Sequence, residues 1–405
     1  MGRMPIYMDH NATTPVDPRV VEAMLPCFTQ HYGNPASRTH PFGWAAAKLV
    51  DQARQAIAAG IGAHPEEIIF TSGATEANNL AIKGFARSLG DRAGEIITCA
   101  TEHHAVLDPC RGLAAEGFTV KVLGVDGTGR LASGALAEAL TPATRLVSIM
   151  LANNEIGTIQ PIAELASLCR ERGVLVHCDA TQAVGKIPLD VEALGVDLLS
   201  FSAHKLYGPK GIGALYLRRR RPRLRLAALF DGGGHEDGMR SGTLNVPGIV
   251  GFARALELAL ADLPGESERL AALRNQLCEG IRSRLGGVIE NGPPAARLPN
   301  TLNLSFAGVD GAALLAGLAE VAISSGSACT SADPRPSHVL AALGRSRQLA
   351  AASLRFSLGR SNTAEEVRVV ADTVVREVAR LREGSPLWHK QGAGDRGPRT
   401  GEASH

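Results

Sequence analysis

Aromatic residues are scarce in this sequence of 405 residues, and its charges nearly cancel. Phe, Trp and Tyr make up 4% of the chain, which argues against the stacked aromatic rings that bind single-stranded nucleic acids. Lys and Arg number 42 against 40 Asp and Glu, so the net charge of +2 argues against a protein that binds polyanions. No apolar run approaches the roughly 20 residues that span a bilayer, and the first ten residues lack an apolar signal core, so we expect a cytoplasmic protein.

The cysteines are widely spaced and odd in number, and they include no C-x-x-C pair. This argues against a zinc ribbon and against a disulfide framework. Most of the seven are expected to be buried thiols, and at most one or two to carry chemistry. They are Cys27, Cys99, Cys110, Cys169, Cys178, Cys278 and Cys329.

Short apolar runs alternate with helical patterns over the first two thirds of the chain. This alternation predicts an α/β fold with a mostly parallel central sheet flanked by helices. Strands are expected at 95–99, 119–123, 145–150, 174–178, 197–201, 214–217, 301–306 and 321–324, and helices at 44–59, 75–88, 106–115 and 162–172. Such sheets bind ligands beyond the carboxyl ends of their strands, so the functional residues are expected there.

The last third of the chain predicts a second, smaller α+β domain. A helical stretch from about 252 to 284, broken near Pro264, leads into it. Thr363 and Glu366 form a capping box ahead of its last helix. We expect a large domain at 15–260, a small domain formed by 1–14 and 261–384, and a largely disordered tail at 385–405.

A carboxylate and a lysine follow two neighbouring predicted strands. Asp179 comes directly after one strand and is a candidate to bind a metal, a ribose or a protonated ring nitrogen, or simply to cap a helix. Lys205 follows the next strand, where an ammonium is costly unless it is paired. A lysine that serves as an amine in a Schiff base belongs at such a place, although a lysine that only caps the strand would also fit.

Small and polar residues follow other strands. The segment 71–76 (Thr-Ser-Gly-Ala-Thr-Glu) opens a helical pattern and is either an anion site or a plain capped turn. It matches neither a Walker A loop nor G-x-G-x-x-G, so ATP and NAD are not indicated. Thr101–His104 and Asn153–Glu155 follow two further strands. A lysine, a carboxylate, an anion cup and a flat side chain are together what pyridoxal phosphate requires.

On these residues the sequence resembles the cysteine desulfurases, members of the class V aminotransferase group with the fold type I of pyridoxal phosphate enzymes. The resemblance covers about residues 5–390 and is greater to the housekeeping iron–sulfur-cluster type than to the nitrogenase-associated type. It rests on the segments 12–15, 71–76, 101–103, 153–157, 177–182, 202–205, 240–243, 324–329 and 355–360.

The resemblance implies a role for each candidate site residue. Lys205 would bond to the cofactor aldehyde, Asp179 would pair with the pyridinium nitrogen, Gln182 would pair with the phenolic oxygen, and His103 would stack on the ring and transfer protons. Thr75, Ser202 and His204 would bind the phosphate, and Asn154 and Arg355 would hold the substrate carboxylate. Ala74 and Asn154 would also contact the cofactor. Thr243 would reach the phosphate in a second subunit, which implies a homodimer.

Cys329 is the cysteine to which the resemblance assigns chemistry. It lies in a small, polar segment at about 324–336 that is expected to be a mobile loop. Its thiolate would take the sulfur of L-cysteine as a persulfide, release L-alanine and pass the sulfur to an acceptor, which we expect to be an iron–sulfur scaffold protein. The Gly- and Arg-rich tail departs from the more apolar ending of the family and leaves the acceptor open.

Other functions remain open on the sequence alone. A selenocysteine lyase and a sulfur donor for tRNA thiolation would use the same lysine and aspartate. A plain aminotransferase has no use for a loop cysteine, and a non-enzymatic sulfur relay has no use for Lys205 or Asp179. No metal site is expected, because the histidines follow separate strands without a clear ligand set.

Overall fold

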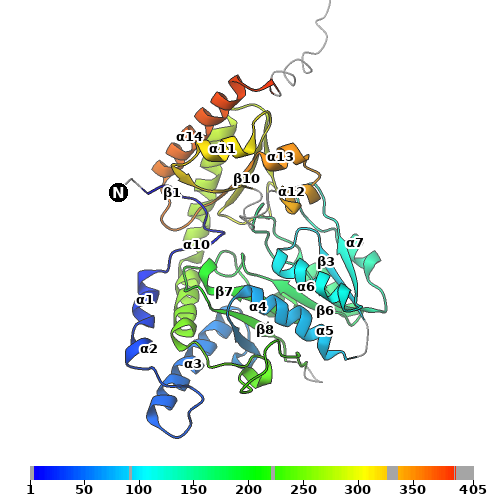
Figure 1. The fold of residues 1–405 in the computed structure, drawn as a ribbon, viewed down its shortest axis with the longest axis vertical. Coiled ribbons are helices and arrows are strands. Elements are labelled where there is room, and N and C mark those ends of the chain that lie inside the picture. The colour runs from blue at the N-terminus through cyan, green and yellow to red at the C-terminus, as the bar shows by residue number, and fades with distance from the viewer. Residues whose placement is uncertain (1–3, 91–93, 220–223, 326–335, 387, 389–405) are drawn as a thin grey trace, which may run out of the picture.

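A computed structural model describes residues 4–90, 94–219, 224–325, 336–386 and 388. Cys329 with most of its predicted loop, and the predicted disordered tail beyond 388, therefore lie outside the described residues. The molecule has a wide part built on a seven-stranded sheet and a narrower part built on a four-stranded sheet (Figure 1). No described helix is both long and apolar enough to cross a membrane.

The larger sheet has the strand order β2-β8-β7-β6-β5-β3-β4. Only β8 runs antiparallel to its neighbours, which confirms the prediction of a mostly parallel sheet. Its strands are β2 (Ile68–Thr71), β3 (Glu95–Cys99), β4 (Thr119–Leu123), β5 (Thr144–Ser148), β6 (Leu175–Asp179), β7 (Leu198–Ser202) and β8 (Gly213–Leu217).

Helices cover both faces of this sheet because successive strand residues point to opposite sides. Leu198 packs into one apolar cluster and Leu199 into the other. One face carries α3 (Pro41–Gly60), α7 (Ser133–Ala139), α8 (Ile162–Glu171), α9 (Val191–Leu194) and the first half of α10 (Val246–Arg282). The other face carries α4 (Ala74–Asn79), the π-helix η2 (Leu80–Gly84), α5 (Phe85–Ser88) and α6 (His104–Ala115). Against α10 lie α1 (Pro18–Met24) and α2 (Pro26–Thr29), and short 3-10 turns are η1 (Pro65–Glu67), η3 (Ala203–Lys205) and η4 (Glu236–Gly238).

The smaller sheet is antiparallel, with the order β12-β13-β10-β9. Its strands are β9 (Val288–Asn291), β10 (Thr301–Phe306), β12 (Ser324–Ser325) and β13 (Ser353–Ser357), and a parallel pair joins β1 (Ile6–Tyr7) to β11 (Val321–Ala322). The helices nearby are α11 (Gly311–Gly317), α12 (His338–Ala342), α13 (Arg347–Ala351) and α14 (Ala364–Glu383). The predicted capping box of Thr363 and Glu366 is confirmed at the start of α14.

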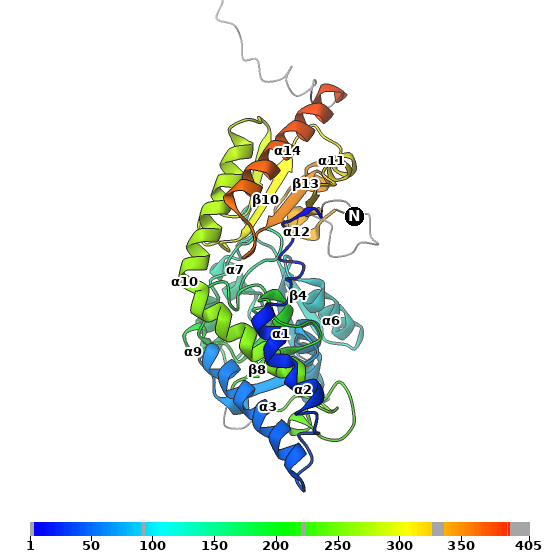
Figure 2. The ribbon, with the colours of Figure 1, turned by 90° about the vertical axis from the view of Figure 1, so that its left-hand side faces the viewer.

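The prediction of a helix break near Pro264 is wrong, because α10 is continuous with Pro264 inside it. An internal proline removes one backbone hydrogen bond. Pro264 is exposed, and each half of the helix is held by its own apolar cluster, the first by Phe252 and its neighbours and the second by Leu277 and its neighbours. Figure 2 shows α10 running from one part of the molecule into the other. Because α10 passes through position 260, the expected domain boundary there stays a prediction.

Candidate active site

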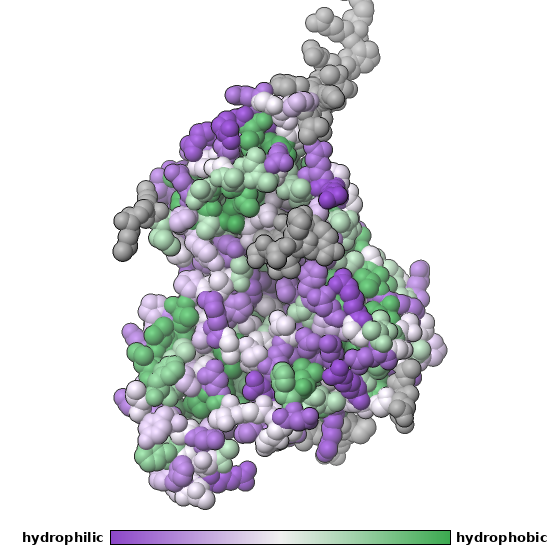
Figure 3. Space-filling model, viewed as in Figure 1, coloured by the Kyte–Doolittle hydropathy of each residue, from purple (hydrophilic) through white to green (hydrophobic). Residues whose placement is uncertain are grey.

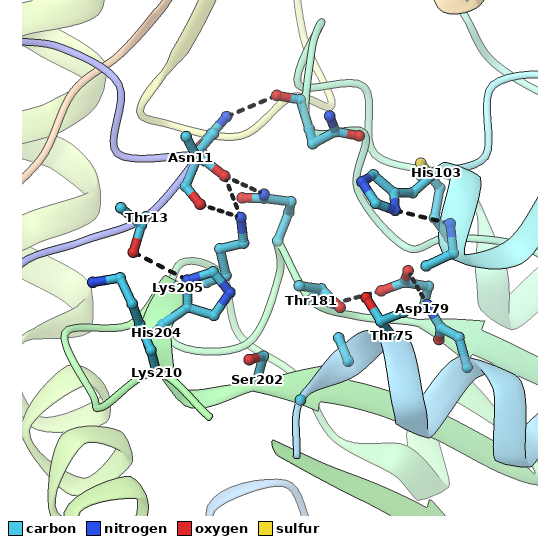
Figure 4. Close-up of a pocket in the computed structure, with 18 of the residues that line it drawn as sticks. Asn11, Thr13, Thr75, His103, Asp179, Thr181, Ser202, His204, Lys205 and Lys210 are labelled. Carbon is cyan, nitrogen blue, oxygen red and sulfur yellow. Dashed lines mark hydrogen bonds between the residues drawn. The ribbon is translucent and has the colours of Figure 1, made fainter. Parts of the chain in front are cut away.

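A cavity of about 600 Å3 opens where the carboxyl ends of β6 and β7 meet residues from the N-terminus and the smaller sheet. Ten of the residues predicted for the site line it: Ala74, Thr75, His103, Asn154, Asp179, Gln182, Ser202, His204, Lys205 and Arg355. In Figure 4, Lys205 and His204 lie on one side of the cavity, and Asp179, His103 and Thr75 lie on the other. The structure thus brings together side chains that the sequence places after separate strands.

Lys205 reaches the cavity at the end of the short turn that follows β7. Its Nζ donates to the carbonyl oxygens of Asn11 and Ala12, each at 2.6 Å. These acceptors come from the N-terminal segment, which runs from the parallel pair of β1 and β11 to the cavity. The amine is therefore held in place by carbonyl oxygens that can each release it to another partner.

Asp179 is the last residue of β6, and it is 5% exposed. Asp179 pairs in register with Ser200 on β7, which ends two residues later. The turn after β7 then leads to Lys205. Asn78 donates to Oδ2 at 2.8 Å, and the backbone N–H of Thr181 donates to Oδ1 at 2.9 Å. Donors on both oxygens fix the direction in which this buried carboxylate faces the cavity.

His103 caps the start of α6, and this sets its tautomer. Its Nδ1 accepts from the backbone N–H of Ala105 at 3.1 Å, so the proton of the neutral ring is on Nε2. Burial lowers the pKa of His103, the charge of Lys205 lowers it further, and Asp179 opposes the shift. The ring is therefore neutral at pH 7, with one N–H that it can give or take back.

Small and polar groups also line the cavity, among them Gly73, Ser202 and His204. Gly73 has a φ of +154°, in the region that favours glycine, and it lets the chain turn from β2 into α4. His204 Nδ1 and Thr13 Oγ1 share a hydrogen bond of 3.1 Å. Burial, then the charges of nearby lysines, lower the pKa of His204 to about 4, so it offers a neutral ring. Ser202 Oγ lies 3.4 Å from the carbonyl oxygen of Ile212.

Arg355 comes to the cavity from β13 of the smaller sheet and is 3% exposed. Its Nη2 donates to Asp9 Oδ1 at 2.7 Å and to Ser324 Oγ at 2.9 Å, and its Nη1 donates to the carbonyl oxygen of Asn154 at 3.3 Å. The guanidinium is thus oriented by Asp9 while it lines the cavity with Asn154. Such a rigid fork suits the carboxylate of a small substrate.

Two predicted site residues are not found at this cavity. Thr243 is exposed and does not line it. Cys329 lies outside the described residues, but Ser324 before its segment contacts a residue of the cavity, and Ser337 after it contacts Glu155, which follows the cavity residue Asn154 in the chain. Ser324 binds Arg355, and Ser337 Oγ donates to Glu155 Oε2 at 2.5 Å.

None of the six cysteines that the structure describes lines the cavity. Burial raises the pKa of Cys99 to about 11 and that of Cys110 to about 12, and it raises the pKa of Cys178 well above its usual range. Burial likewise raises the pKa of Cys27, that of Cys169 to about 12 and that of Cys278 to about 11. A thiol must ionise to act as a nucleophile, so these six are unsuited to the task.

Several residues at the site were not predicted. Asn11 accepts from Lys205, and Asn78 orients Asp179. Thr181 lines the cavity two residues after Asp179. Asn11 directly precedes the 12–15 motif and Asn78 lies two residues after the 71–76 segment. The neighbouring motifs therefore pointed to both residues, although nothing in the sequence indicated their contacts.

Comparison with known proteins gives consistent relatives over nearly the whole chain. The family described as aminotransferase class-V matches residues 6–370. Cysteine desulfurase IscS of Anaeromyxobacter dehalogenans (strain 2CP-C) is 54% identical over 386 residues, covering 95% of each chain. The cysteine desulfurase of Mus musculus is 53% identical over 384 residues, covering 95% of this chain and 83% of its own. A solved NifS-like protein has a TM-score of 0.87 and 40% identity, covering 93% of this chain and all of its own. SspA in complex with cysteine has a TM-score of 0.78 and 38% identity, covering 87% of this chain and 98% of its own.

Proposed function

The chain belongs to the class-V aminotransferase family and is a pyridoxal-phosphate-dependent cysteine desulfurase, and from this premise we propose how its own residues perform the reaction. We propose that the sulfur of L-cysteine passes to Cys329 as a persulfide, that L-alanine leaves, and that the persulfide supplies iron–sulfur cluster assembly. The observation that carries the proposal is the convergence of Lys205 and Asp179 on one cavity.

The residues of the cavity fit pyridoxal phosphate. Thr181 and Arg355 line it, and each has a buried polar atom, Oγ1 and Nε, without a hydrogen-bond partner among the described residues. The cofactor would be held by Lys205 at its aldehyde, by Asp179 at its ring nitrogen and by the small residues around Thr75 at its phosphate. Bound there, it supplies an aldehyde that bonds to amines and a protonated ring that accepts electrons.

Lys205 and His103 are the groups that move protons. The amine of Lys205, once released from its carbonyl acceptors, takes the proton from the α-carbon of the substrate and gives it back. His103 is neutral and carries its proton on Nε2, so it can relay a proton to or from a thiol. Arg355 and Asn154 hold the substrate carboxylate and thereby present the α-carbon to Lys205.

Cys329 takes the sulfur. Its thiolate forms an S–S bond with the substrate sulfur while the Cβ–S bond of the substrate breaks, and the electron pair of that bond remains with the carbon. The substrate thiol hydrogen stays with the persulfide, the carbon takes up a proton, and the product leaves as L-alanine. The anchoring of Ser324 and Ser337 beside Arg355 and Glu155 supports the delivery of Cys329 to this place.

We expect the purified full chain to show a visible absorption band of its cofactor and to release alanine and sulfide in equal amounts from L-cysteine and dithiothreitol. The two products are equal because each turnover breaks one Cβ–S bond. A band without products from L-cysteine would overturn the assignment of the substrate, and L-selenocysteine in the same assay would then test the selenocysteine lyase. A protein without a band after addition of pyridoxal phosphate would overturn the cofactor site.

The acceptor is best supported as a protein. An iron–sulfur scaffold agrees with the resemblance to the housekeeping type, while a carrier for tRNA thiolation is the second candidate. We also propose a cytoplasmic location. It is supported by the six described cysteines, all of which are free thiols, as is usual in reducing compartments.

We propose that the enzyme is a homodimer in which Thr243 completes the site of the partner. Large apolar side chains are exposed together on α1, on α2 and around the start of α3: Val21, Leu25, Phe28, Tyr32, Phe42 and Trp44. Figure 3 shows the apolar surface over α1 and α2. Exposed apolar patches of this kind mark interaction sites. We propose that a second copy of the chain covers this patch, because a dimer would also bring Thr243 to the active site of the partner.

The parent is expected to sediment as two chains and the double variant Leu25→Asp/Phe28→Asp as a single chain. The reason is that the interface would have to bury two unpaired carboxylates, which is costly. The matched control is Val369→Asp on α14, which also places a charge at an exposed apolar position and should leave the dimer intact. A parent protein that sediments as one chain with its cofactor fully bound would contradict both the dimer and the role of Thr243.

A further inference from the structure

A lysine lies behind the cavity, where the reaction as proposed does not use it. Lys186 does not line the 600 Å3 cavity; it lines a separate cavity of about 30 Å3. Gln182, four residues earlier, does line the larger cavity. Lys186 thus stands on the far side of Gln182 from the space that the cofactor would fill.

The backbone after β6 fixes where Lys186 lies. Successive turns follow Asp179, with the N–H of Val184 donating to Ala180 at 3.1 Å. Gly185 has a φ of +73°, which favours glycine, and a Cβ there would come within 3.0 Å of the Cβ of Ala259 on α10. Ser267 Oγ, also on α10, donates to the carbonyl oxygen of Lys186 at 3.1 Å. The backbone at Lys186 is therefore fixed by its contacts with α10.

The amine of Lys186 donates to two side-chain oxygens. It lies 2.6 Å from Gln182 Oε1 and 3.1 Å from Asn11 Oδ1. Asn11 is oriented independently, because its Nδ2 donates to the carbonyl oxygen of Asn154 at 3.1 Å, which can only accept. Gln182 Nε2 donates to the backbone carbonyl oxygen of Asn11 at 2.9 Å. A flipped Gln182 amide would set its NH2 against the amine and its oxygen against a carbonyl, so the observed orientation is the one that satisfies every group.

The surroundings of Lys186 disfavour its charged form, so the amine depends on its hydrogen bond to Gln182. Burial, followed by the charges of Lys205 and Arg355, lowers the pKa of Lys186 well below its usual range. The charged and titratable groups that interact with it are Lys205, Arg355, His10 and His204. A partly buried amine in such company is costly unless its hydrogen bonds are made, and Gln182 supplies the shorter of the two.

We propose that Lys186 is a positioning residue, whose amine holds the side-chain carbonyl of Gln182 so that the amide nitrogen of Gln182 faces the cofactor. The inference rests on the proposed function, in which Gln182 pairs with the phenolic oxygen of pyridoxal phosphate. That oxygen carries negative charge and needs an N–H donor. Nε2 has two hydrogens, and Asn11 accepts one of them, which leaves one for the cofactor.

The consequence can be read in the absorption spectrum of the bound cofactor. The band shifts when the nitrogen that joins the cofactor to Lys205 loses its proton. The phenolic oxygen then no longer shares that proton, so a donor from the protein stabilises the deprotonated form more than the protonated form. A variant that loses the donor is therefore expected to show a higher pH midpoint for the spectral change.

The experiment titrates this band in the holoenzyme of the parent and of Lys186→Met, Gln182→Leu and the double variant. We expect each single variant to raise the midpoint by about one pH unit, and the double variant to raise it no further, because both remove the same donor. Lys186→Gln removes the charge but keeps an N–H donor, and it should restore most of the parent midpoint. Lys121→Met removes a lysine that pairs with Glu95 at 2.7 Å away from the cavity, and it should leave the midpoint unchanged.

Three outcomes would overturn the proposal. Additive shifts in the double variant, or equal shifts in Lys186→Met and Lys186→Gln, would mean that Lys186 acts through its charge and not through Gln182. An unchanged midpoint in Lys186→Met would mean that Gln182 needs no support. Thermal unfolding of the apoproteins identifies a variant that fails to fold. If Lys186→Met is such a variant, the midpoints of Lys186→Gln and Gln182→Leu still test the proposal, because the first should lie near the parent midpoint and the second above it. A parent without a band would instead refute the proposed function itself.

Discussion

Replacing Lys205 by alanine is expected to lower the turnover of L-cysteine by about 10^2 to 10^4-fold, the range that a positioned acid–base group contributes. The reason is geometric, because Lys205 lines the cavity across from Asp179 and its Nζ is held by two carbonyl oxygens. Lys210 also lines the cavity, but Lys205 is the amine that we propose to bond to the aldehyde and to move the proton of the α-carbon, and alanine can do neither. The measurement is the rate of alanine formation together with the visible spectrum.

The spectrum separates this loss from simple unfolding. The variant should still bind pyridoxal phosphate through Asp179 and the residues near Thr75, but the band should be that of the free aldehyde. Lys48→Ala, which removes an exposed lysine on α3, is the matched control and should turn over normally. A Lys205→Ala enzyme that keeps the parent rate and band would place the covalent link on another lysine.

The sheet could be predicted largely from the sequence, because most of its strands are short apolar runs, and β6 and β7 each end in a polar residue. The strands expected at 95–99, 119–123 and 301–306 agree with β3, β4 and β10 at both ends, and most others differ by one or two residues. The parallel direction of β6 and β7 then brings Asp179 and Lys205 to the same edge of the sheet, since parallel strands end at the same edge. The stretch 321–324 is instead divided between β11 and β12.

Contacts between distant segments could not be predicted. Asn11 lies 194 residues from Lys205, and no local pattern states that its carbonyl oxygen receives the amine. The ion pair between Asp9 and Arg355 likewise joins residues that lie 346 positions apart. Lys186 was visible only as one of few lysines, since its role depends on the turn at Gly185 and on α10, which packs against that turn.

Replacing Cys329 by serine is expected to lower the release of alanine and sulfide by about 10^4-fold or more, the scale on which loss of a nucleophile acts in other enzymes. The cofactor band should remain, because Lys205, Asp179 and the phosphate-binding residues are untouched. The argument for Cys329 is partly one of chemistry. The six described cysteines are held away from the cavity with raised pKa values, whereas the residues flanking Cys329 contact Arg355 and Glu155.

Mass spectrometry of the parent protein after L-cysteine alone should find one extra sulfur atom on the peptide that contains Cys329, and none on that peptide in the serine variant. Cys278→Ser is the matched control, since Cys278 is half-buried beside Glu290 with its pKa raised to about 11, and it should keep both the rate and the persulfide. Normal sulfide release by Cys329→Ser would show that another thiol takes the sulfur. The persulfide must also leave the cavity to reach its acceptor. A variant that forms the persulfide on Cys329 but does not pass its sulfur to an acceptor would show that persulfide formation and sulfur transfer depend on different residues.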